Sequence, residues 1–229
     1  MNLNPPPETE DVQELKRWCD DLYEFLKYPV FGRMDIGDGT NYTTFANDGE
    51  LTQAGTARVE KEIEITASSL APGSTGPAAT ILGNYLGYSY DIGDDSVADF
   101  EIPYDWDTST ALTVKIYWYC DEDYAVGDNN GEVQWRIRWS AMPKDESETV
   151  DSPTHTGTID FGDQNIPANA KELTVSSSGT IAAASLSSGD LVGFTIDRIA
   201  LDGGNNPTAD PVIVRIEIEY YSDRLGEAT

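Results

Sequence analysis

The stretch "LTVKIYWYC", residues 112–120, decides the fold because apolar and polar side chains alternate along it. Successive side chains of a β-strand point to opposite faces of the sheet. One face of this segment is therefore apolar, whereas the other carries Thr113, Lys115, Tyr117 and Tyr119. The pattern predicts a strand of an antiparallel sheet that packs one face on a core.

The same period of two recurs in three other segments, and it places Trp118, Trp135 and Trp139 on inward faces. Loops rich in Asp, Asn, Gly, Ser and Pro separate the segments, and weaker patterns bring the expected number of strands to about eight. The strong segments are 59–65, 112–120, 132–141 and 212–221, and the weaker ones are 86–92, 98–102, 173–176 and 191–199. This organisation predicts an all-β, jelly-roll-like antiparallel β-sandwich.

A short amphipathic helix is predicted ahead of the strands, over residues 11–29. Its apolar residues follow steps of three and four, which is the spacing of a coiled-coil seam. Aromatic residues on both sides of the seam widen the apolar stripe, and a wide stripe favours three or more helices, or a groove. We expect an assembly interface formed by Val12, Leu15, Trp18, Cys19, Leu22, Phe25 and Leu26.

The pattern leaves the partner of this helix open. A lone helix of this length is marginal in water, so its stability has to come from a partner surface. Three partners fit the apolar stripe: the chain's own sandwich, copies of the same helix, most simply in a homotrimer, or a different protein.

The chain divides into three predicted regions. Residues 1–31 form an N-terminal arm and the amphipathic helix, which would serve assembly or attachment. Residues 32–56 are rich in Gly, Asp, Asn and Thr and form a neck, in which Asp48-Gly49 between two β-prone runs predicts a β-hairpin. Residues 57–229 form the β-sandwich domain.

Charge limits the partners of the protein. Forty-one Asp and Glu residues against fourteen Lys and Arg residues give a net charge of −27, which repels nucleic acid and anionic membranes. The N-terminus does not resemble a signal peptide, and no continuous apolar segment approaches the length that spans a bilayer. We expect neither a nucleic-acid partner nor a membrane partner. Two cysteines in different contexts indicate synthesis in a reducing compartment.

No catalytic constellation, cofactor site or metal site is expected. His155 is the single histidine and has no Ser or Cys nucleophile motif around it, while Cys19 and Cys120 fall at packing positions. One His and two scattered Cys argue against zinc, the acidic loops lack EF-hand spacing, and phosphate-binding glycine loops are missing. We therefore expect a protein that is not an enzyme. A carbohydrate-active enzyme stays open as an alternative, because a glycosidase needs only two carboxylates.

Tyr117 and Tyr119 are the candidates for contact with a sugar, because both are expected to face outward, where rings can stack on a glycan. The competing interpretation is that these rings fill a second packed face or a subunit interface.

Three segments resemble β-sandwich virion structural proteins of tailed phages and related viruses. They are "GDGTNYTTFANDGELTQAGTARVEKEI" (37–63), "IPYDWDTSTALTVKIYWY" (102–119) and "EIEYYSDRLGEAT" (217–229). In that family a TNYT-x-F-x-x-DG hairpin leads through G-x-A-R-V into a β domain, and I-P-x-D-W-D precedes a strand that ends in aromatic residues. The closing segment departs from the family at Glu227, where Ser is expected.

The resemblance implies a β-sandwich component of a virus particle and carries over no catalytic residue. Because a strongly negative protein is poorly placed against packaged DNA, we expect it on the exterior of the virion, as a capsid decoration or head fibre made in the host cytoplasm. Its partners would be its own copies in a homotrimer joined through the N-terminal region, and other virion proteins of the capsid or tail. The alternative is a tail-associated receptor-binding module that recognises a host glycan.

Overall fold

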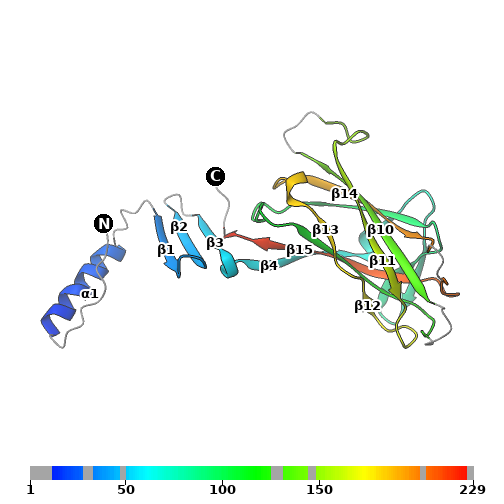
Figure 1. The fold of residues 1–229 in the computed structure, drawn as a ribbon, viewed down its shortest axis with the longest axis horizontal. Helices are drawn as coiled ribbons and strands as arrows, with labels where there is room; N and C mark the ends of the chain where they lie inside the picture. Colours follow the sequence, from blue (N-terminus) through cyan, green and yellow to red (C-terminus); the bar gives the residue numbers. More distant parts are fainter. Residues whose placement is uncertain are drawn as a thin grey trace.

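The structure, a computed structural model, describes residues 12–27, 33–46, 50–124, 131–143, 148–201 and 205–225. Figure 1 shows three parts in succession along the long axis: helix α1 (Val12–Lys27), a small sheet that forms the neck, and a β-sandwich. The predicted fold class is confirmed: an all-β, jelly-roll-like antiparallel sandwich with a short N-terminal helix and a Gly-rich neck.

The first layer of the sandwich is a seven-stranded antiparallel sheet. Its strands are β4 (Val59–Thr66), β6 (Ala78–Leu82), β7 (Tyr85–Ser89), β9 (Leu112–Tyr119), β12 (Thr174–Val175), β13 (Gly179–Ile181) and β15 (Val212–Ser222). β15 is central, because it pairs with β9 along one edge and with β4 and β7 along the other. Ile216 of β15 lies between Ile116 of β9 and Ile65 of β4, so one row of the sheet is apolar on its core face.

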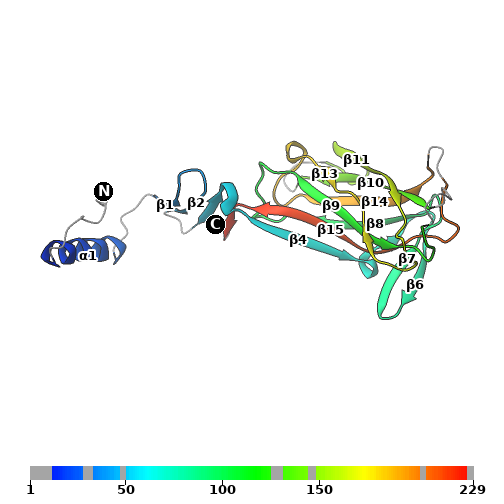
Figure 2. The same cartoon turned by 60° about the horizontal axis from the view of Figure 1, so that its bottom comes forward.

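The second layer is a five-stranded antiparallel sheet. Its strands are, in spatial order, β11 (His155–Asn165), β10 (Glu132–Met142), β14 (Leu191–Ile199), β8 (Asp95–Glu101) and β5 (Ala71–Pro72). Figure 2 shows this layer above the seven-stranded sheet. Three short 3₁₀ turns, Gly55–Ala57, Ala67–Ser69 and Ala183–Ser185, complete the described elements.

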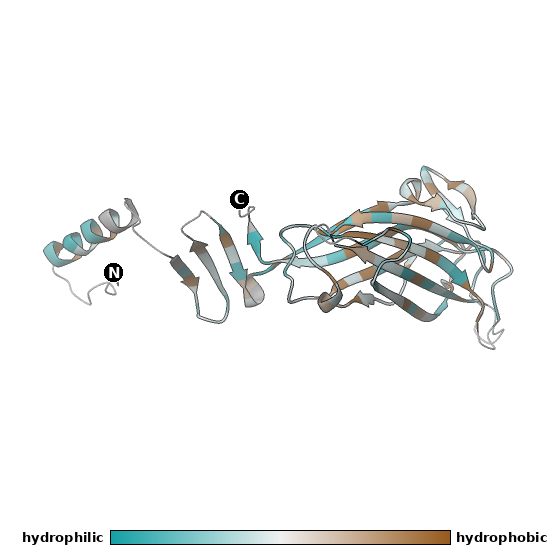
Figure 3. Cartoon of the chain, turned by 90° about the horizontal axis from the view of Figure 1, so that it is seen from above, coloured by the Kyte–Doolittle hydropathy of each residue, from teal (hydrophilic) through white to brown (hydrophobic). Residues whose placement is uncertain are grey.

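The hydrophobic core lies between the two sheets. Trp118 of β9 meets Trp135 of β10 edge-on, with ring centroids 6.0 Å apart, and Tyr90 meets Trp135 at 5.4 Å. Both tryptophans and Trp139 are buried, as the alternation predicted. Figure 3 shows the same alternation as apolar and polar colours that change along the strands. Burial of these side chains is the main term that favours folding.

β11 is an eleven-residue strand that the sequence pattern did not predict. One of its inward positions is Gly157, which lies opposite Trp139 in the register. A Cβ atom on Gly157 would lie 2.6 Å from the indole of Trp139, so the glycine makes room for that ring. Because the residue that the packing requires is glycine, the apolar alternation is interrupted where the strand begins.

The neck is a four-stranded antiparallel sheet. Its strands are β1 (Arg33–Gly37), β2 (Tyr42–Ala46), β3 (Leu51–Ala54) and β16 (Arg224–Leu225). β2 and β3 form the expected hairpin, although its turn residues, Asp48 and Gly49, lie outside the described residues. β16 pairs with β3, so two residues that we expected in the 57–229 sandwich belong to the neck sheet. Pairing between distant segments leaves no local sequence signal.

Candidate functional site

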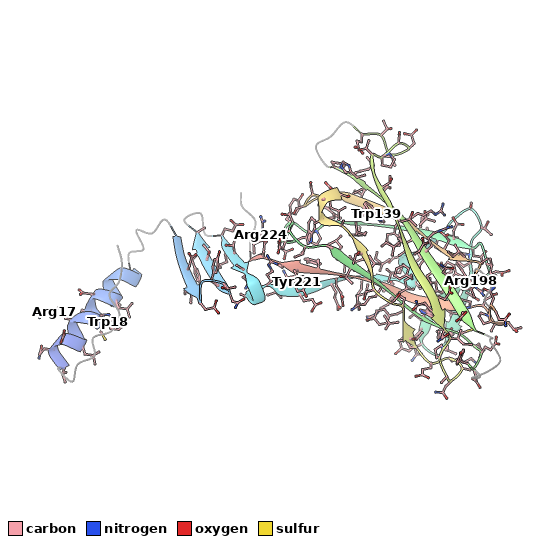
Figure 4. All side chains as sticks on the ribbon, viewed as in Figure 1. Arg17, Trp18, Trp139, Arg198, Tyr221 and Arg224 are labelled. Atoms are coloured by element: carbon pink, nitrogen blue, oxygen red, sulfur yellow. The ribbon has the colours of Figure 1, made fainter. Side chains whose placement is uncertain are left out.

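Helix α1 carries the expected assembly interface. Val12 is 73% exposed and Leu15 is 44% exposed, while Trp18 and Leu22 are partly buried. Figures 1 and 4 show the helix beyond the neck, away from the sandwich. Within the described part of the chain, the sandwich does not cover the apolar face of the helix. The other expected members are Cys19, which is exposed, and Phe25 and Leu26, whose side chains lie outside the described residues.

Tyr117 and Tyr119, the two candidates for contact with a sugar, are engaged in packing. Tyr119 is only 7% exposed, so its ring is not accessible to a ligand. The hydroxyl of Tyr117 donates to Glu217 at 3.1 Å, and the guanidinium of Arg215 lies 4.1 Å from the ring centroid. This cation–π contact covers one face of the ring. The geometry favours the interpretation in which these rings fill a second packed face.

A row of paired charges continues that face. Glu217 is buried, and its carboxylate lies 3.0 Å from Nη2 of Arg215 and 4.0 Å from Nζ of Lys115. Lys115 also donates to Glu219, and this hydrogen bond raises the pKa of Lys115. Buried charges are tolerated only when paired, and these pairs meet that condition. The four charges of this row are paired with one another, so the row stabilises the sheet.

Residues from the segments 37–63, 102–119 and 217–229 meet where the neck joins the sandwich. Asp107 accepts a hydrogen bond from Ser109 N at 2.9 Å and pairs with Arg58 Nε at 2.8 Å. The backbone N–H of Asp107 donates to the carbonyl of Tyr221 at 2.7 Å, and Trp106 forms an isolated antiparallel β-bridge with Ser222. We call the side chains of Arg58, Lys61, Asp105, Trp106, Asp107 and Ser222 the junction cluster. Figure 4 labels Tyr221, which precedes Ser222 in the chain, and Arg224, which follows it.

Asp105 is the second carboxylate of the junction cluster. It accepts hydrogen bonds from Lys61 and, at 3.0 Å, from Ser222 Oγ. Burial acts to raise the pKa of Asp105, but the hydrogen bonds from Lys61 and Ser222 and the charge of Lys61 outweigh it, so this pKa lies below its usual value. The I-P-x-D-W-D segment thus connects the start of β4 to the end of β15, which is a structural role.

Hydrogen bonds to Asp38 and the close approach of Gly55 shape a turn in the neck. Asp38 accepts backbone hydrogen bonds from Asn41 at 2.6 Å and Thr40 at 2.9 Å, which lower the pKa of Asp38. Gly55 has φ +62°, and a Cβ there would lie 2.5 Å from the carbonyl oxygen of Thr40. Only glycine fits this position. These residues shape a turn and do not converge on a ligand.

The acidic loops also have structural partners. Asp95 accepts a hydrogen bond from Thr75 N at 2.8 Å, and Glu122 accepts from Thr208 N at 2.6 Å and Ala209 N at 2.9 Å. Carboxylates that cap backbone N–H groups stabilise loops. In the described residues, no three His, Cys, Asp or Glu side chains gather closely enough to hold a metal ion, and no helix has the length and apolarity to cross a membrane.

The remaining residues weighed for chemistry lie apart from one another. His155 begins β11, and its Nδ1 lies 3.6 Å from Glu148 and 3.3 Å from Thr154 Oγ1. Cys120 is buried in the sandwich, and this burial raises the pKa of its thiol to about 11. A thiol in that state is a poor nucleophile.

The outer face of the five-stranded sheet holds a depression that the sequence did not reveal. It has a volume of about 400 Å³ and lies over β10, β14 and β8. Gly193 forms its floor, with Ser140 on one side and Asp99 on the other in the strand register. Arg138 and Thr195 form the next row along the same strands. We call this depression the Gly193 groove.

Buried Asp197 fixes the arginine of the Gly193 groove. Its Oδ1 accepts from Arg138 Nε at 3.2 Å and Nη2 at 3.1 Å, while its Oδ2 accepts from Arg136 Nε at 2.8 Å. A second depression, of about 290 Å³, adjoins the groove at Arg138. The only sequence signal for this arrangement is the Arg-x-Arg spacing on the outward face of a strand, in a chain with few basic residues.

No protein-family model matches the chain, and no curated protein matches it in sequence. Solved structures give remote likenesses. The CBM36-1 domain of a multidomain xylanase from the hindgut metagenome of Trinervitermes trinervoides is 12% identical, with 74% of this chain and 99% of that chain covered and a TM-score of 0.36. The carbohydrate-binding module CBM36 in complex with calcium and xylotriose is 13% identical, with 68% and 98% covered and a TM-score of 0.36.

Lectin UEA-II complexed with galactose is 6% identical, with 71% of this chain and 98% of the lectin covered and a TM-score of 0.28. At these identities and TM-scores the likenesses carry no argument about function. The fold and the sites define the class directly: an all-β sandwich protein that is joined by a neck to an amphipathic helix.

Proposed function

We propose that this chain is a non-enzymatic structural protein on the exterior of a virus particle, where its N-terminal helices assemble a homotrimer and its sandwich faces solvent. The observation that carries the proposal is the apolar face of α1, which the sandwich leaves uncovered. Val12 and Leu15 are exposed, and the neck separates them from the sandwich core. The resemblance of the neck and junction segments to phage virion proteins supports the same function.

The energetics of the helix require a partner. An isolated helix of sixteen residues is marginal in water. Burial of five or six of its apolar side chains contributes on the order of 10 kcal/mol before the loss of conformational entropy. Three copies that place Leu15, Cys19 and Leu22 in one seam supply that surface without any other protein.

Net charge supports the exterior position. A chain that carries −27 is repelled by the phosphates of packaged DNA, and it is soluble when it faces water. Antibodies against the sandwich should therefore label intact particles of the virus that encodes the chain. Labelling that appears only after the particles are opened would contradict the exterior position.

Light scattering with size-exclusion chromatography tests the assembly. At micromolar concentration, the wild type should have three times the 25.0 kDa mass of one chain. Leu22→Glu places a charge in the seam and should give a monomer with a folded sandwich. Arg17→Glu, on the opposite side of the helix, is the matched control and should stay trimeric. A monomeric wild type would refute self-association.

Cys19 provides an independent readout. Its thiol is exposed in the monomer and occupies the seam of the proposed trimer. A thiol reagent should therefore modify Cys19 much faster in Leu22→Glu than in the wild type. Equal rates in the two proteins would show that the seam does not close over Cys19.

The second candidate function is recognition of a host glycan by a tail-associated receptor-binding module. The Gly193 groove favours it, because polar side chains surround an open depression on the outer face of a sheet. A glycan array probed with the purified protein tests this function. If no glycan of the array binds, glycan recognition is excluded for the sugars presented.

A further inference from the structure

We infer that the Gly193 groove binds an uncharged saccharide. The inference rests on the second proposed function, glycan recognition, and assigns to it a site and a class of ligand. The groove lies on the sheet opposite to the one that carries Tyr117 and Tyr119, so it is a different location from the one that the sequence predicted.

The floor of the groove is open because one residue has no side chain. Gly193 lies opposite Ser140 on one neighbouring strand and opposite Asp99 on the other. Adjacent strands are about 4.8 Å apart, so Ser140 and Asp99 stand about 10 Å apart with an empty position between them. A Cβ on Gly193 would meet no atom closer than Ser140 Oγ at 4.0 Å.

No packing constraint accounts for this glycine. Gly157 is needed because a Cβ there would strike Trp139, and Gly55 is needed for its positive φ, but neither condition holds at Gly193. Glycine weakens the interior of a strand, and it often marks a position that a ligand approaches closely. We infer that the space above Gly193 is kept free for a ligand.

Three polar side chains around the floor have hydrogen-bonding capacity to spare. Within the described part of the chain, Asp99, Ser140 and Thr195 make no side-chain hydrogen bond or ion pair, in contrast to Asp95 and Glu122, which cap loop N–H groups. A carboxylate accepts hydrogen bonds, and a hydroxyl both donates and accepts them. A ligand with several hydroxyl groups satisfies both kinds of partner.

Arg138 adds a donor that is held in place. The Nε and Nη2 atoms of Arg138 donate to Asp197, which is only 4% exposed. Nη1 of Arg138 has no partner in the described residues. The side chain of Arg138 is 54% exposed, so a ligand can reach it. Because Asp197 fixes the guanidinium, little side-chain entropy is lost when Arg138 donates to a ligand. Asp197 is therefore a positioning residue.

The balanced charges of the groove and the negative net charge of the chain favour an uncharged ligand. The groove is lined by one arginine and one aspartate, whose charges balance, in a chain of net charge −27. An anionic ligand would meet Asp99 and the field of the whole protein, whereas a neutral sugar donates to Asp99 and accepts from Arg138. Val97, exposed beside Thr195, offers apolar contact to the C–H face of a sugar ring.

The test combines an array of neutral and acidic oligosaccharides with calorimetric titration of the best ligand. Gly193→Val fills the groove and should abolish binding, while a strand-favouring side chain in open space keeps the thermal stability equal or raises it. Asp99→Ala should weaken affinity roughly tenfold or more, which is the expected loss of a hydrogen bond to a charged group. Thr180→Val, on an exposed position of the other sheet, is the control and should leave affinity unchanged.

Each result decides a separate point. Binding of a neutral sugar that Gly193→Val abolishes and Thr180→Val preserves supports the site. Binding that survives Gly193→Val and Asp99→Ala overturns the site but leaves glycan recognition intact. Selective binding of acidic sugars overturns the ligand class. Failure of the wild type to bind any sugar overturns the inference together with the second proposed function.

Discussion

Replacement of Asp107 by alanine should loosen the attachment of the neck to the sandwich. The side chain is buried, and its two oxygens have separate partners. Oδ1 accepts from Ser109 N at 2.9 Å and Ser109 Oγ at 2.7 Å, while Oδ2 pairs with Arg58 Nε at 2.8 Å. The substitution removes both hydrogen bonds from Ser109 and leaves the guanidinium of Arg58 without its ion-pair partner.

The magnitude follows from these contacts. Hydrogen bonds to charged groups contribute roughly 1.5–3 kcal/mol each, and a buried charge left without its partner adds a penalty. Arg58 is one third exposed, so water recovers part of the loss. We therefore expect the free energy of unfolding to fall by about 2–4 kcal/mol, which corresponds to a decrease in Tm of roughly 5–15 °C for a domain of this size.

Thermal unfolding followed by circular dichroism measures the effect. The control is Asp163→Ala, which removes an exposed carboxylate of β11 and should change stability by no more than about 0.5 kcal/mol. Asp107→Asn separates the two contacts, since it keeps an acceptor for Ser109 but loses the charge opposite Arg58. A decrease in Tm below about 2 °C for Asp107→Ala would refute the role given to the junction cluster.

Three further predictions concern a glycine, a carboxylate and a thiol. Gly157→Ala should destabilise the protein by about 1–3 kcal/mol, because its Cβ would lie 2.6 Å from the indole of Trp139. Unchanged urea denaturation would contradict this packing. Asp105 has a lowered pKa, so it stabilises the fold above its unfolded pKa of about 3.8, and this contribution should be lost as pH falls through the lower folded value. Unfolding free energies between pH 6 and pH 2 should therefore depend less on pH in Asp105→Asn, and identical profiles would exclude the linkage. In a Cys19→Ser variant, Cys120 should react with a thiol reagent at pH 8 only when the sandwich unfolds, since burial raises its pKa to about 11. Rapid reaction of this variant in the folded state would show that the thiol of Cys120 is accessible.

Period-two alternation was sufficient to predict the strands that pack one face on the core. β14 coincides with the predicted 191–199 segment, and β9 matches the stretch 112–120 to within one residue. The pattern failed where packing demands glycine, as at the inward position of Gly157 in β11. It also failed for β16, because the pairing of β16 with β3 joins segments that are far apart in the sequence.

The helix and the Gly193 groove differ in how much the sequence reveals. The proposed interface on α1 is local, so the steps of three and four in the sequence are enough to predict its residues. The floor of the groove is a glycine of β14 between one residue of β8 and one of β10, and no local spacing connects Asp99, Ser140 and Gly193. Tyr117 and Tyr119 were candidates for sugar contact because alternation assigns a face, but alternation does not show that Arg215 covers the ring of Tyr117.

The two strands that link the neck to the sandwich lie side by side in one sheet. β3 leads into β4 and β15 leads into β16, while β4 and β15 pair along eight residues. A force that pulls the sandwich away from the neck acts along both strands at once. The hydrogen bonds between β15 and β9 are then loaded in shear, so they share the force. In the proposed assembly on a particle, a copy under tension should therefore release at its helical contacts before its sandwich tears from the neck.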